Sequence, residues 1–400
     1  MSADAVPTLP VTRTCPYAPP AEHLRLREEC PIAKVKLPND TTVWVATSHK
    51  DIRAILSDPR FSSNRRHPNF PTLSYDRPPA SNLKPMLLEL DPPDHGPARR
   101  ALLGEFTIQR INALGPRIQQ IVDEHIDAML AGPRPVDLVQ ALSLPVPSLV
   151  ICELLGVPYT DHEFFQTHSA QVVNNKTPGD VKLQSVVELM TYLGKLVGAK
   201  AQNPTDDLLG RQIQKQLQET GSLDFEGMVS MAFLLLIAGH ETTANMISLS
   251  TLVLLQHPEK LAAIKQDPSK TIGAVEELLR YFTIAESALG RVAKEDVEIG
   301  GVVIKAGEGI FALANTANRD PEVFENADEL DLERGSRNHL AFGFGPHQCL
   351  GQNLARLELQ IVIDTLFRRI PELRAAVPFE ELSFKDSSTV YGMNEFPVTW

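Results

Sequence analysis

The chain has 400 residues, of which 43% are hydrophobic and 22% are charged, so it can bury a substantial core and is not a disordered protein. Its formal net charge of −12 excludes nucleic acid as the main partner. Its cysteines, Cys15, Cys30, Cys152 and Cys349, form no C-x-x-C pair, which suggests neither a zinc knuckle nor a disulfide scaffold and favours a reducing cytoplasm. We expect no signal peptide, because the first 20 residues show no basic region followed by an apolar run, and no membrane span, because the most apolar segment, residues 228–239, is too short to cross a bilayer.

The N-terminal part of the chain is rich in proline, and residues 1–20 are expected to be irregular. Apolar residues then alternate over Val43–Ala46, which predicts a strand. A short helix should begin at Ser48 and end before Pro59, because serine caps helices and proline stops them. Residues 62–86 contain five prolines and little periodicity, so they predict a long loop, and loops of that length inside compact domains are usually functional.

From Ala98 to about Lys270 the pattern is largely helical. An apolar stripe over residues 111–130 predicts one helix, and Asp206 and Asp207 mark the start of another. Further helices are expected at residues 144–158, 227–257, 272–282 and 353–370, and short strands at residues 291–313. The helix at 227–257 is apolar nearly all round and should run through the middle of the molecule. The chain is predicted to be one mainly α domain with small β-sheets (α+β), spanning residues 1–400.

The sequence FGFGPHQCLG, residues 342–351, places Cys349 among three glycines. Glycine permits backbone conformations and close approaches that a Cβ would block. The helix expected after this loop puts the thiol near a helix N-terminus, where the dipole stabilises a thiolate. Such a thiolate could be a nucleophile, a redox thiol or a metal ligand, whereas an arbitrary cysteine is most often a small buried hydrophobe.

The spacing F-x-x-G-x-x-x-C-x-G, which arises by chance about 0.0005 times in a chain of this composition, resembles the heme-thiolate loop of the cytochrome P450 superfamily. The resemblance implies the single-domain cytochrome P450 fold and heme b (iron protoporphyrin IX) as the cofactor. It makes Cys349 the axial ligand of the heme iron, a ligation that favours O–O cleavage, with Phe342 packed against the heme. The sequence most resembles soluble bacterial members of the actinomycete type.

AGHETT, residues 238–243 of the long apolar helix, resembles the oxygen-binding segment of the family. Small Ala238 and Gly239 would leave room for dioxygen beside the iron. The resemblance makes Thr242 the alcohol that hydrogen-bonds this oxygen and Glu241 the acid that relays protons through water. The hydroxyl of a threonine inside a helix more often hydrogen-bonds a backbone carbonyl of the same helix. A catalytic role of Thr242 is favoured because the cysteine loop occurs in the same chain.

The E-x-x-R sequence at Glu277 and Arg280 resembles a third family motif, whose pair meets an arginine of the following meander segment. Arg334 is the candidate for that arginine. The motif is weak by itself, because Glu22 and Arg25 repeat it and an i,i+3 pair is ordinarily a surface contact. We assign Glu277, Arg280 and Arg334 to folding and to the architecture beside the heme, not to chemistry.

DPPDHGPARR, residues 91–100, resembles the segment whose side chains hold the heme propionates. With this segment included, the resemblance assigns four propionate donors: His95, Arg99, Arg291 and His347. The family usually lacks a proline at the position of Pro97. If Asp94 is the N-cap, Pro97 falls in the first turn of the helix, where no backbone hydrogen bond is lost, and His95 and Arg99 remain one turn apart.

The resemblance implies a monooxygenase that inserts one oxygen atom of O2 into a mostly apolar small molecule. A polyketide, a terpenoid, a steroid-like compound or a xenobiotic fits, and a role in secondary metabolism is expected. Electrons would come from NAD(P)H through a ferredoxin reductase and a ferredoxin, and the protein should be a monomer. By family position, the substrate is expected to contact Leu234, Ala238, Ser287 and Leu289.

Two other functions remain open. Parts of the chain also resemble fungal heme-thiolate nitric oxide reductases, which take electrons directly from NADH, and Arg65 and Arg66 could hold the dinucleotide. Those reductases generally have no acid at the position of Glu241, so this residue favours oxygen activation. The other alternative is a non-catalytic heme-binding sensor, which would need neither Glu241 nor Thr242.

Overall fold

The computed structural model describes residues 6–9, 11–74, 84–285, 288–386 and 388–400. Helices predominate and the sheets are small, which confirms the predicted mainly α class. The chain divides into two compact units, each of which collects distant segments of the sequence. Unit 1 comprises Met1–Arg77, His257–Gln352 and Phe384–Gly392, and unit 2 comprises Pro78–Gln256, Asn353–Ser383 and Met393–Trp400.

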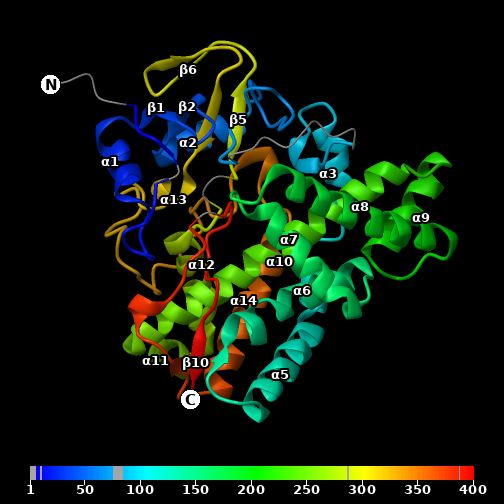
Figure 1. Cartoon of the computed structure of the whole chain (residues 1–400), viewed down its shortest axis with the longest axis vertical. Coiled ribbons are helices and arrows are strands. Elements are labelled where there is room, and N and C mark those ends of the chain that lie inside the picture. Colours follow the sequence, from blue (N-terminus) through cyan, green and yellow to red (C-terminus); the bar gives the residue numbers. More distant parts are fainter. Residues whose placement is uncertain (1–5, 10, 75–83, 286–287, 387) are drawn as a thin grey trace. The chain divides into compact units, whose positions relative to one another are not determined.

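Unit 1 is built around a five-stranded sheet (Figure 1). Its strands lie in the order β1 (Ile32–Lys36), β2 (Thr42–Ala46), β8 (Gly309–Ala312), β5 (Gly290–Ala293) and β3 (Phe61–Ser62). The β2–β8 pair is parallel, and the other three pairs are antiparallel. A separate hairpin joins β6 (Val297–Ile299) to β7 (Val302–Ile304). The strands predicted at Val43–Ala46 and within residues 291–313 are therefore confirmed.

Helix α2 (His49–Ser57) covers this sheet with a buried apolar face. Its N-cap is Ser48, whose hydroxyl accepts a hydrogen bond from the Asp51 N–H, as predicted for a helix that begins there. Ile52 and Ile55 are fully buried in one cluster with residues of β5 and β8. The other helices of unit 1 are α1 (Ala21–Glu29), α11 (Pro258–Gln266), α12 (Thr271–Phe282) and α13 (Ala314–Ala317), with short 3-10 turns η4 (Pro268–Lys270) and η5 (Gly345–His347).

Unit 2 is organised around α10 (Phe225–Gln256), which is 32 residues long and buried along most of its length. Helices α6 (Pro145–Leu155) and α8 (Gly179–Gln202) pack against it (Figure 1). This confirms the central helix expected at residues 227–257. By length and composition alone α10 could cross a membrane, a test that the buried core helix of a soluble protein also meets.

The rest of unit 2 consists of shorter helices and one small sheet. Its remaining α-helices are α3 (His95–Leu103), α4 (Ile108–Ala113), α5 (Gly115–Ala131), α7 (His162–Val173), α9 (Leu208–Thr220) and α14, which spans Gln352–Arg369. The sheet has the order β4 (Val136–Asp137), β10 (Pro397–Thr399) and β9 (Arg374–Ala375). Short 3-10 helices are η1 (Leu87–Glu89), η3 (Tyr159–Asp161) and η6 (Phe379–Glu381), and η2 (Val139–Ser143) is a π-helix.

The single helix predicted over residues 111–130 is wrong, because the structure divides this segment between α4 and α5. Pro116 is the reason: it has no N–H to continue the first helix, and it suits the first turn of the second. The aspartate signal at the start of α9 is confirmed, since the Asp207 side chain accepts a hydrogen bond from the Gly210 N–H at 2.9 Å. The described parts of the predicted loop at 62–86 contain no helix and, after Ser62, no strand; residues 75–83 lie outside the described chain.

Candidate functional site

The cysteine loop, residues 342–351, is a tight turn in unit 1. The N–H of Cys349 donates a hydrogen bond to the carbonyl oxygen of Phe342 at 2.9 Å, which closes the loop. A Cβ on Gly345 would lie 2.7 Å from the carbonyl oxygen of Leu56 in α2, and the φ of Gly345 is +72°. The Cys349 side chain is partly exposed, and α14 begins three residues later at Gln352. The glycines thus allow the loop to pack closely while the thiol remains accessible at a helix entry.

Replacement of Gly345 by alanine is expected to destabilise this loop by about 1–2 kcal/mol through the left-handed backbone alone. The contact with Leu56 should add to this cost, because that neighbour is backbone and cannot move aside easily. Thermal unfolding and the heme content of the purified protein measure the effect. The matched control is Gly351→Ala, because a Cβ at Gly351 meets nothing within 4 Å. Equal behaviour of the two variants would contradict the close-packing argument.

Two other predicted site residues of unit 1, His347 and Leu289, lie in or next to this loop. His347 lies in η5, two residues before Cys349, and is half-buried. Leu289 lies next to the loop, since its Cδ2 atom would be 3.5 Å from a Cβ on Gly343. Arg291 on β5 is 6% exposed, and its Nη1 donates to the Gly290 carbonyl oxygen at 2.7 Å. Ser287, the remaining predicted substrate contact of this segment, lies outside the described residues.

The E-x-x-R pair on α12 is fully buried. Glu277 Oε2 lies 2.7 Å from Arg280 Nε, and both side chains are 0% exposed. Arg334 joins them, with its Nε 3.2 Å from Glu277 Oε2. Arg280 also donates from Nη1 to the carbonyl oxygen of Asn318 at 2.6 Å. The surface-pair interpretation of this motif is therefore wrong, and the three predicted residues do form one buried ion-pair network.

In unit 2, the predicted acid–alcohol pair lies on α10. Glu241 is 4% exposed, and Asn245 Nδ2 donates to its Oε2 at 3.4 Å. The Thr242 hydroxyl donates to the carbonyl oxygen of Ala238 at 2.7 Å, which is the back-bonding expected of a helical threonine. The hydroxyl oxygen can still accept a hydrogen bond in this arrangement.

One side of α10 differs from the rest of the helix. Leu234, Ala238 and Thr242 are spaced four residues apart, so they lie along the same side. Ala238 is exposed and its two neighbours on this side are half-buried, whereas most other residues of the helix are buried. Gly239 allows α6 to approach, because a Cβ there would lie 2.9 Å from Ile151 Cδ1. Small residues on an accessible side of a buried helix are consistent with a place for a small ligand.

The predicted propionate donors of unit 2 lie at the start of α3. The helix begins at His95 with Asp94 as N-cap, so Pro97 is the third helical residue and falls in the first turn. This is the arrangement under which His95 and Arg99 stay one turn apart. His95 is 3% exposed and Arg99 is half-buried.

Glu358 of α14 is a buried carboxyl that the sequence analysis did not single out. It is 1% exposed, and burial raises its pKa from 4.5 to about 8, against a smaller opposite effect of its hydrogen bond with Thr243. Burial therefore favours the protonated, neutral form of this carboxyl. The available signal was a glutamate at an apolar-stripe position of the helix 353–370.

Between pH 4.5 and about 8 the folded protein holds a proton on Glu358 that the unfolded chain has lost. The free energy of unfolding should therefore fall as pH rises through this window, by up to about 1.4 kcal/mol per pH unit from this group. Glu358→Gln should remove that part of the slope in denaturant titrations at pH 5–8. Glu372→Gln, at an exposed position after α14, is the control. A slope unchanged in Glu358→Gln would show that the carboxyl ionises in the folded protein.

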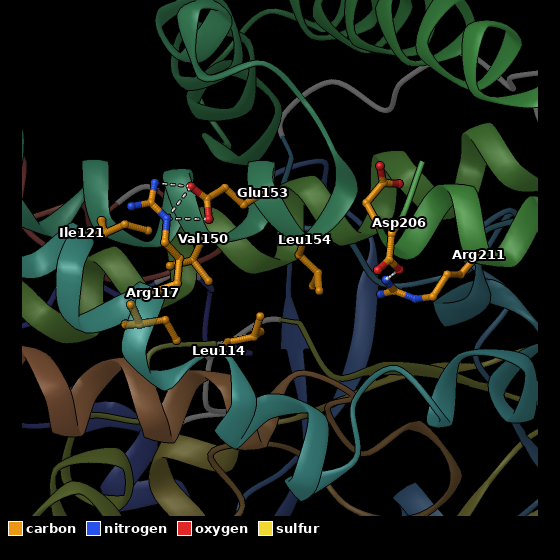
Figure 2. Close-up of a pocket in the computed structure, with 10 residues that line it drawn as sticks. Leu114, Arg117, Ile121, Val150, Glu153, Leu154, Asp206 and Arg211 are labelled. Atoms are coloured by element: carbon orange, nitrogen blue, oxygen red, sulfur yellow. Dashed lines mark hydrogen bonds and ion pairs between the residues drawn. The ribbon is translucent and has the colours of Figure 1, made fainter. Parts of the chain in front are cut away.

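A surface pocket of about 180 Å³ lies in unit 2 between α5, α6 and the start of α9 (Figure 2). Leu114, Ile121 and Leu154 form part of its apolar wall. Its charged rim is internally paired, since Arg117 bonds Glu153 as Figure 2 shows, and Arg211 bonds Asp206. The pocket contains none of the predicted site residues.

The residues present fit a heme-thiolate centre. A single cysteine sulfur at a helix entry is the donor set that such a centre would need, and the close approach of Gly345 to Leu56 leaves no room for a side chain at this point of the loop. Cys349, Phe342, His347 and Arg291 belong to unit 1, whereas the remaining predicted residues, His95, Arg99, Glu241 and Thr242, belong to unit 2.

Comparison with known proteins supports the same family. The Cytochrome P450 family model matches residues 195–370. The chain is 48% identical to pentalenic acid synthase of Streptomyces avermitilis, over 100% of this chain and 98% of the relative. It is similar to the crystal structure of cytochrome P450 MoxA (CYP105) from Nonomuraea recticatena, with 57% identity, a TM-score of 0.90 and 98% of each chain covered. It is also similar to CYP105P1 in complex with filipin I, with 41% identity, a TM-score of 0.93 and 99% of each chain covered.

The two solved structures match nearly the whole chain, so the chain has the single-domain cytochrome P450 fold. The bounds 1–400 of that domain stay a prediction. With the glycine-rich cysteine loop, the buried E-x-x-R network and the acid–alcohol pair described above, the chain belongs to the cytochrome P450 family and is a monooxygenase of the actinomycete CYP105 type.

Proposed function

We propose that this monooxygenase inserts one oxygen atom of O2 into a mostly apolar secondary metabolite. The observation that carries the proposal is the closed glycine loop that presents the partly exposed Cys349 at the entry to α14. Electrons come from NAD(P)H through a ferredoxin reductase and a ferredoxin. The protein acts as a cytoplasmic monomer. The burial of α10 favours a core helix over a membrane span, which agrees with the proposed cytoplasmic location.

Heme b is the proposed cofactor, and when bound it supplies the redox chemistry that activates O2. Cys349 would ligate the iron through its sulfur, and Phe342 would pack beside it. Guanidinium and imidazole N–H groups hold the propionates, because buried carboxylates need charge-assisted donors. These donors are His95, Arg99, Arg291 and His347.

Glu241 and Thr242 have separate tasks on α10. The Thr242 hydroxyl donates its proton to the Ala238 carbonyl oxygen, and its oxygen can accept a hydrogen bond from a ligand without breaking that contact. The buried Glu241 carboxyl, held by Asn245, carries a proton at its oxygens and passes it on through water. The acid at this position supports oxygen activation over nitric oxide reduction.

The substrate class follows from the apolar character of the proposed contacts. Leu234, Ala238 and Leu289 offer methyl and methylene groups, which suit a hydrocarbon-rich molecule. The names of the relatives point the same way, since one forms pentalenic acid and another binds filipin I. The substrate is therefore proposed to be a polyketide, a terpenoid, a steroid-like compound or a xenobiotic.

Optical titration of the heme protein with terpenoid acids, macrolides and steroid-like compounds tests the substrate class. A binding compound should displace water from the iron and shift the Soret band. Turnover with surrogate ferredoxin and ferredoxin reductase should then give a product with one added oxygen atom. If broad panels shift the band but give no oxygenated product, the non-catalytic sensor is favoured.

Nitric oxide reduction is tested separately. Arg65, proposed for dinucleotide binding under that alternative, donates from Nη2 to the Ala288 carbonyl oxygen at 3.0 Å, and its guanidinium lies over the Phe70 ring. We expect no rapid consumption of nitric oxide with NADH alone. Rapid consumption without redox partners would reverse the assignment.

A further inference from the structure

Two consecutive glutamates of α12 are buried against different parts of unit 1. Glu277 belongs to the ion-pair network with Arg280 and Arg334 described above. Glu276 instead meets the segment that leads into the cysteine loop, because its Oε2 lies 2.9 Å from His339 Nε2. The two side chains of this second pair are only 2% and 1% exposed. Helix α12 thus binds two distant segments. Glu277 pairs with Arg334 of the meander segment, and Glu276 pairs with His339, which lies three positions before Phe342.

The hydrogen bonds around His339 indicate which of its two ring nitrogens donates and which accepts. The N–H of Ala341 donates to His339 Nδ1 at 3.3 Å, so Nδ1 is an acceptor. The proton of the neutral ring is therefore on Nε2, which donates to the Glu276 carboxylate. The other oxygen, Oε1, lies 3.2 Å from Nε of Arg337. Each carboxylate oxygen has a donor, and the pair can hold the ring of His339 in one orientation.

His339 connects this pair to the cysteine. Its ring lies beside that of Phe342, with centroids 6.0 Å apart and planes inclined by 46°. The carbonyl oxygen of Phe342 accepts the hydrogen bond from the Cys349 N–H. Three successive contacts therefore link α12 to the cysteine: Glu276 with His339, His339 with Phe342, and Phe342 with Cys349.

We propose that Glu276 and His339 are positioning residues for the thiolate ligand, fixing Phe342 and through it the backbone of Cys349. This inference rests on the proposed role of Cys349 as the axial ligand. Groups that orient a ligand and shape its surroundings tune the metal they do not touch, through the hydrogen bonds and the polarity around the ligand atom. Loss of the pair would free the ring of His339 and loosen Phe342. The sulfur of Cys349 could then change its hydrogen bonds and its distance from the iron.

The test uses the purified heme protein with the variants Glu276→Gln and His339→Phe. His339→Phe keeps a ring against Phe342 but removes both hydrogen bonds, whereas Glu276→Gln keeps an acceptor oxygen for Nε2–H and removes the charge. We expect His339→Phe to raise several-fold the rate at which the reduced carbon monoxide complex loses its thiolate-type Soret band. The heme reduction potential should shift in the same direction in both variants, and less in Glu276→Gln.

Two comparisons separate positioning from general scaffolding. Arg53 stacks on Phe344 of the same loop, with its guanidinium carbon 4.3 Å from the ring centroid, and it is exposed. Arg53→Ala should leave the potential and the band unchanged. The double variant of Glu276 and His339 should be no worse than His339→Phe alone, because the two residues act through one hydrogen bond.

The outcomes distinguish this inference from the proposed function. If the wild-type protein lacks the thiolate-type band, the role of Cys349 itself fails. If the wild type has the band and both variants match it in potential and band lifetime, only the positioning role fails. Full additivity in the double variant would likewise overturn the paired action. If His339→Phe does not fold, the potential of Glu276→Gln against Arg53→Ala decides the question alone.

Discussion

Replacement of Glu241 by glutamine is expected to lower the rate of product formation by about 10²–10⁴-fold. The carboxyl is buried on α10 directly beside Thr242, and an amide cannot carry a proton to the oxygen site. Substrate binding and the reduced carbon monoxide spectrum should not change, because Glu241 is assigned neither to iron ligation nor to substrate contact. Product formation and NAD(P)H consumption, measured with surrogate redox partners, give the rate and the coupling.

Glu226→Gln is the matched control for this prediction. Glu226 lies in the first turn of the same helix and is exposed, so its replacement tests the loss of a carboxylate from α10 without loss of the relay. It should retain wild-type turnover. Wild-type turnover in Glu241→Gln would mean that another group delivers the proton.

Replacement of Glu277 by glutamine is expected to lower the free energy of unfolding by about 3–5 kcal/mol. The guanidinium of Arg280 is 0% exposed, and the variant would leave it buried without its countercharge. Arg334 would lose the same partner. Denaturant titration measures the stability, and the heme content of the purified protein shows whether the loss of the network reaches the cysteine loop.

The chain contains its own control in the second E-x-x-R sequence. Glu22 and Arg25 have the same spacing, and their side chains pair at 2.6 Å but are 26% and 50% exposed. Glu22→Gln should change stability little, because solvent screens this pair. If both variants lose the same small amount of stability, burial does not govern the role of the motif.

The two E-x-x-R pairs show what a local pattern can and cannot predict. Spacing of three on a helix predicts that each pair forms, and both do. The buried pair also contacts residues that are distant in the sequence, Asn318 through Arg280 and Arg334 through Glu277, so spacing alone could not distinguish a surface pair from a buried network. The resemblance to a family supplied that distinction by naming the third residue.

Features set by neighbouring residues were predictable. Serine before α2, aspartate before α9 and the glycines of the cysteine loop each satisfy or free a nearby backbone group, and the structure confirms them. The division between α4 and α5 was missed because an apolar stripe continued across Pro116. An apolar stripe indicates which side of a helix is buried, but it does not indicate where the helix ends.

The buried polar pairs could not be predicted in the same way. Glu276 and His339 are 63 positions apart. Glu276 stands directly before the motif residue Glu277, and His339 stands three positions before Phe342, so neither drew notice in the sequence. Glu358 is similar, because its pKa depends on full burial in the folded unit. Such groups depend on the tertiary fold, and the only local signal was a charged or polar residue within an apolar segment.

The reduced carbon monoxide spectrum of the purified heme protein tests the central assignment of Cys349 most directly, with the variant Cys349→Ser measured beside it. We expect the thiolate-type Soret band in the wild type and its complete absence in the variant. A wild-type spectrum without that band, or a variant that retains it, would contradict Cys349 as the axial ligand.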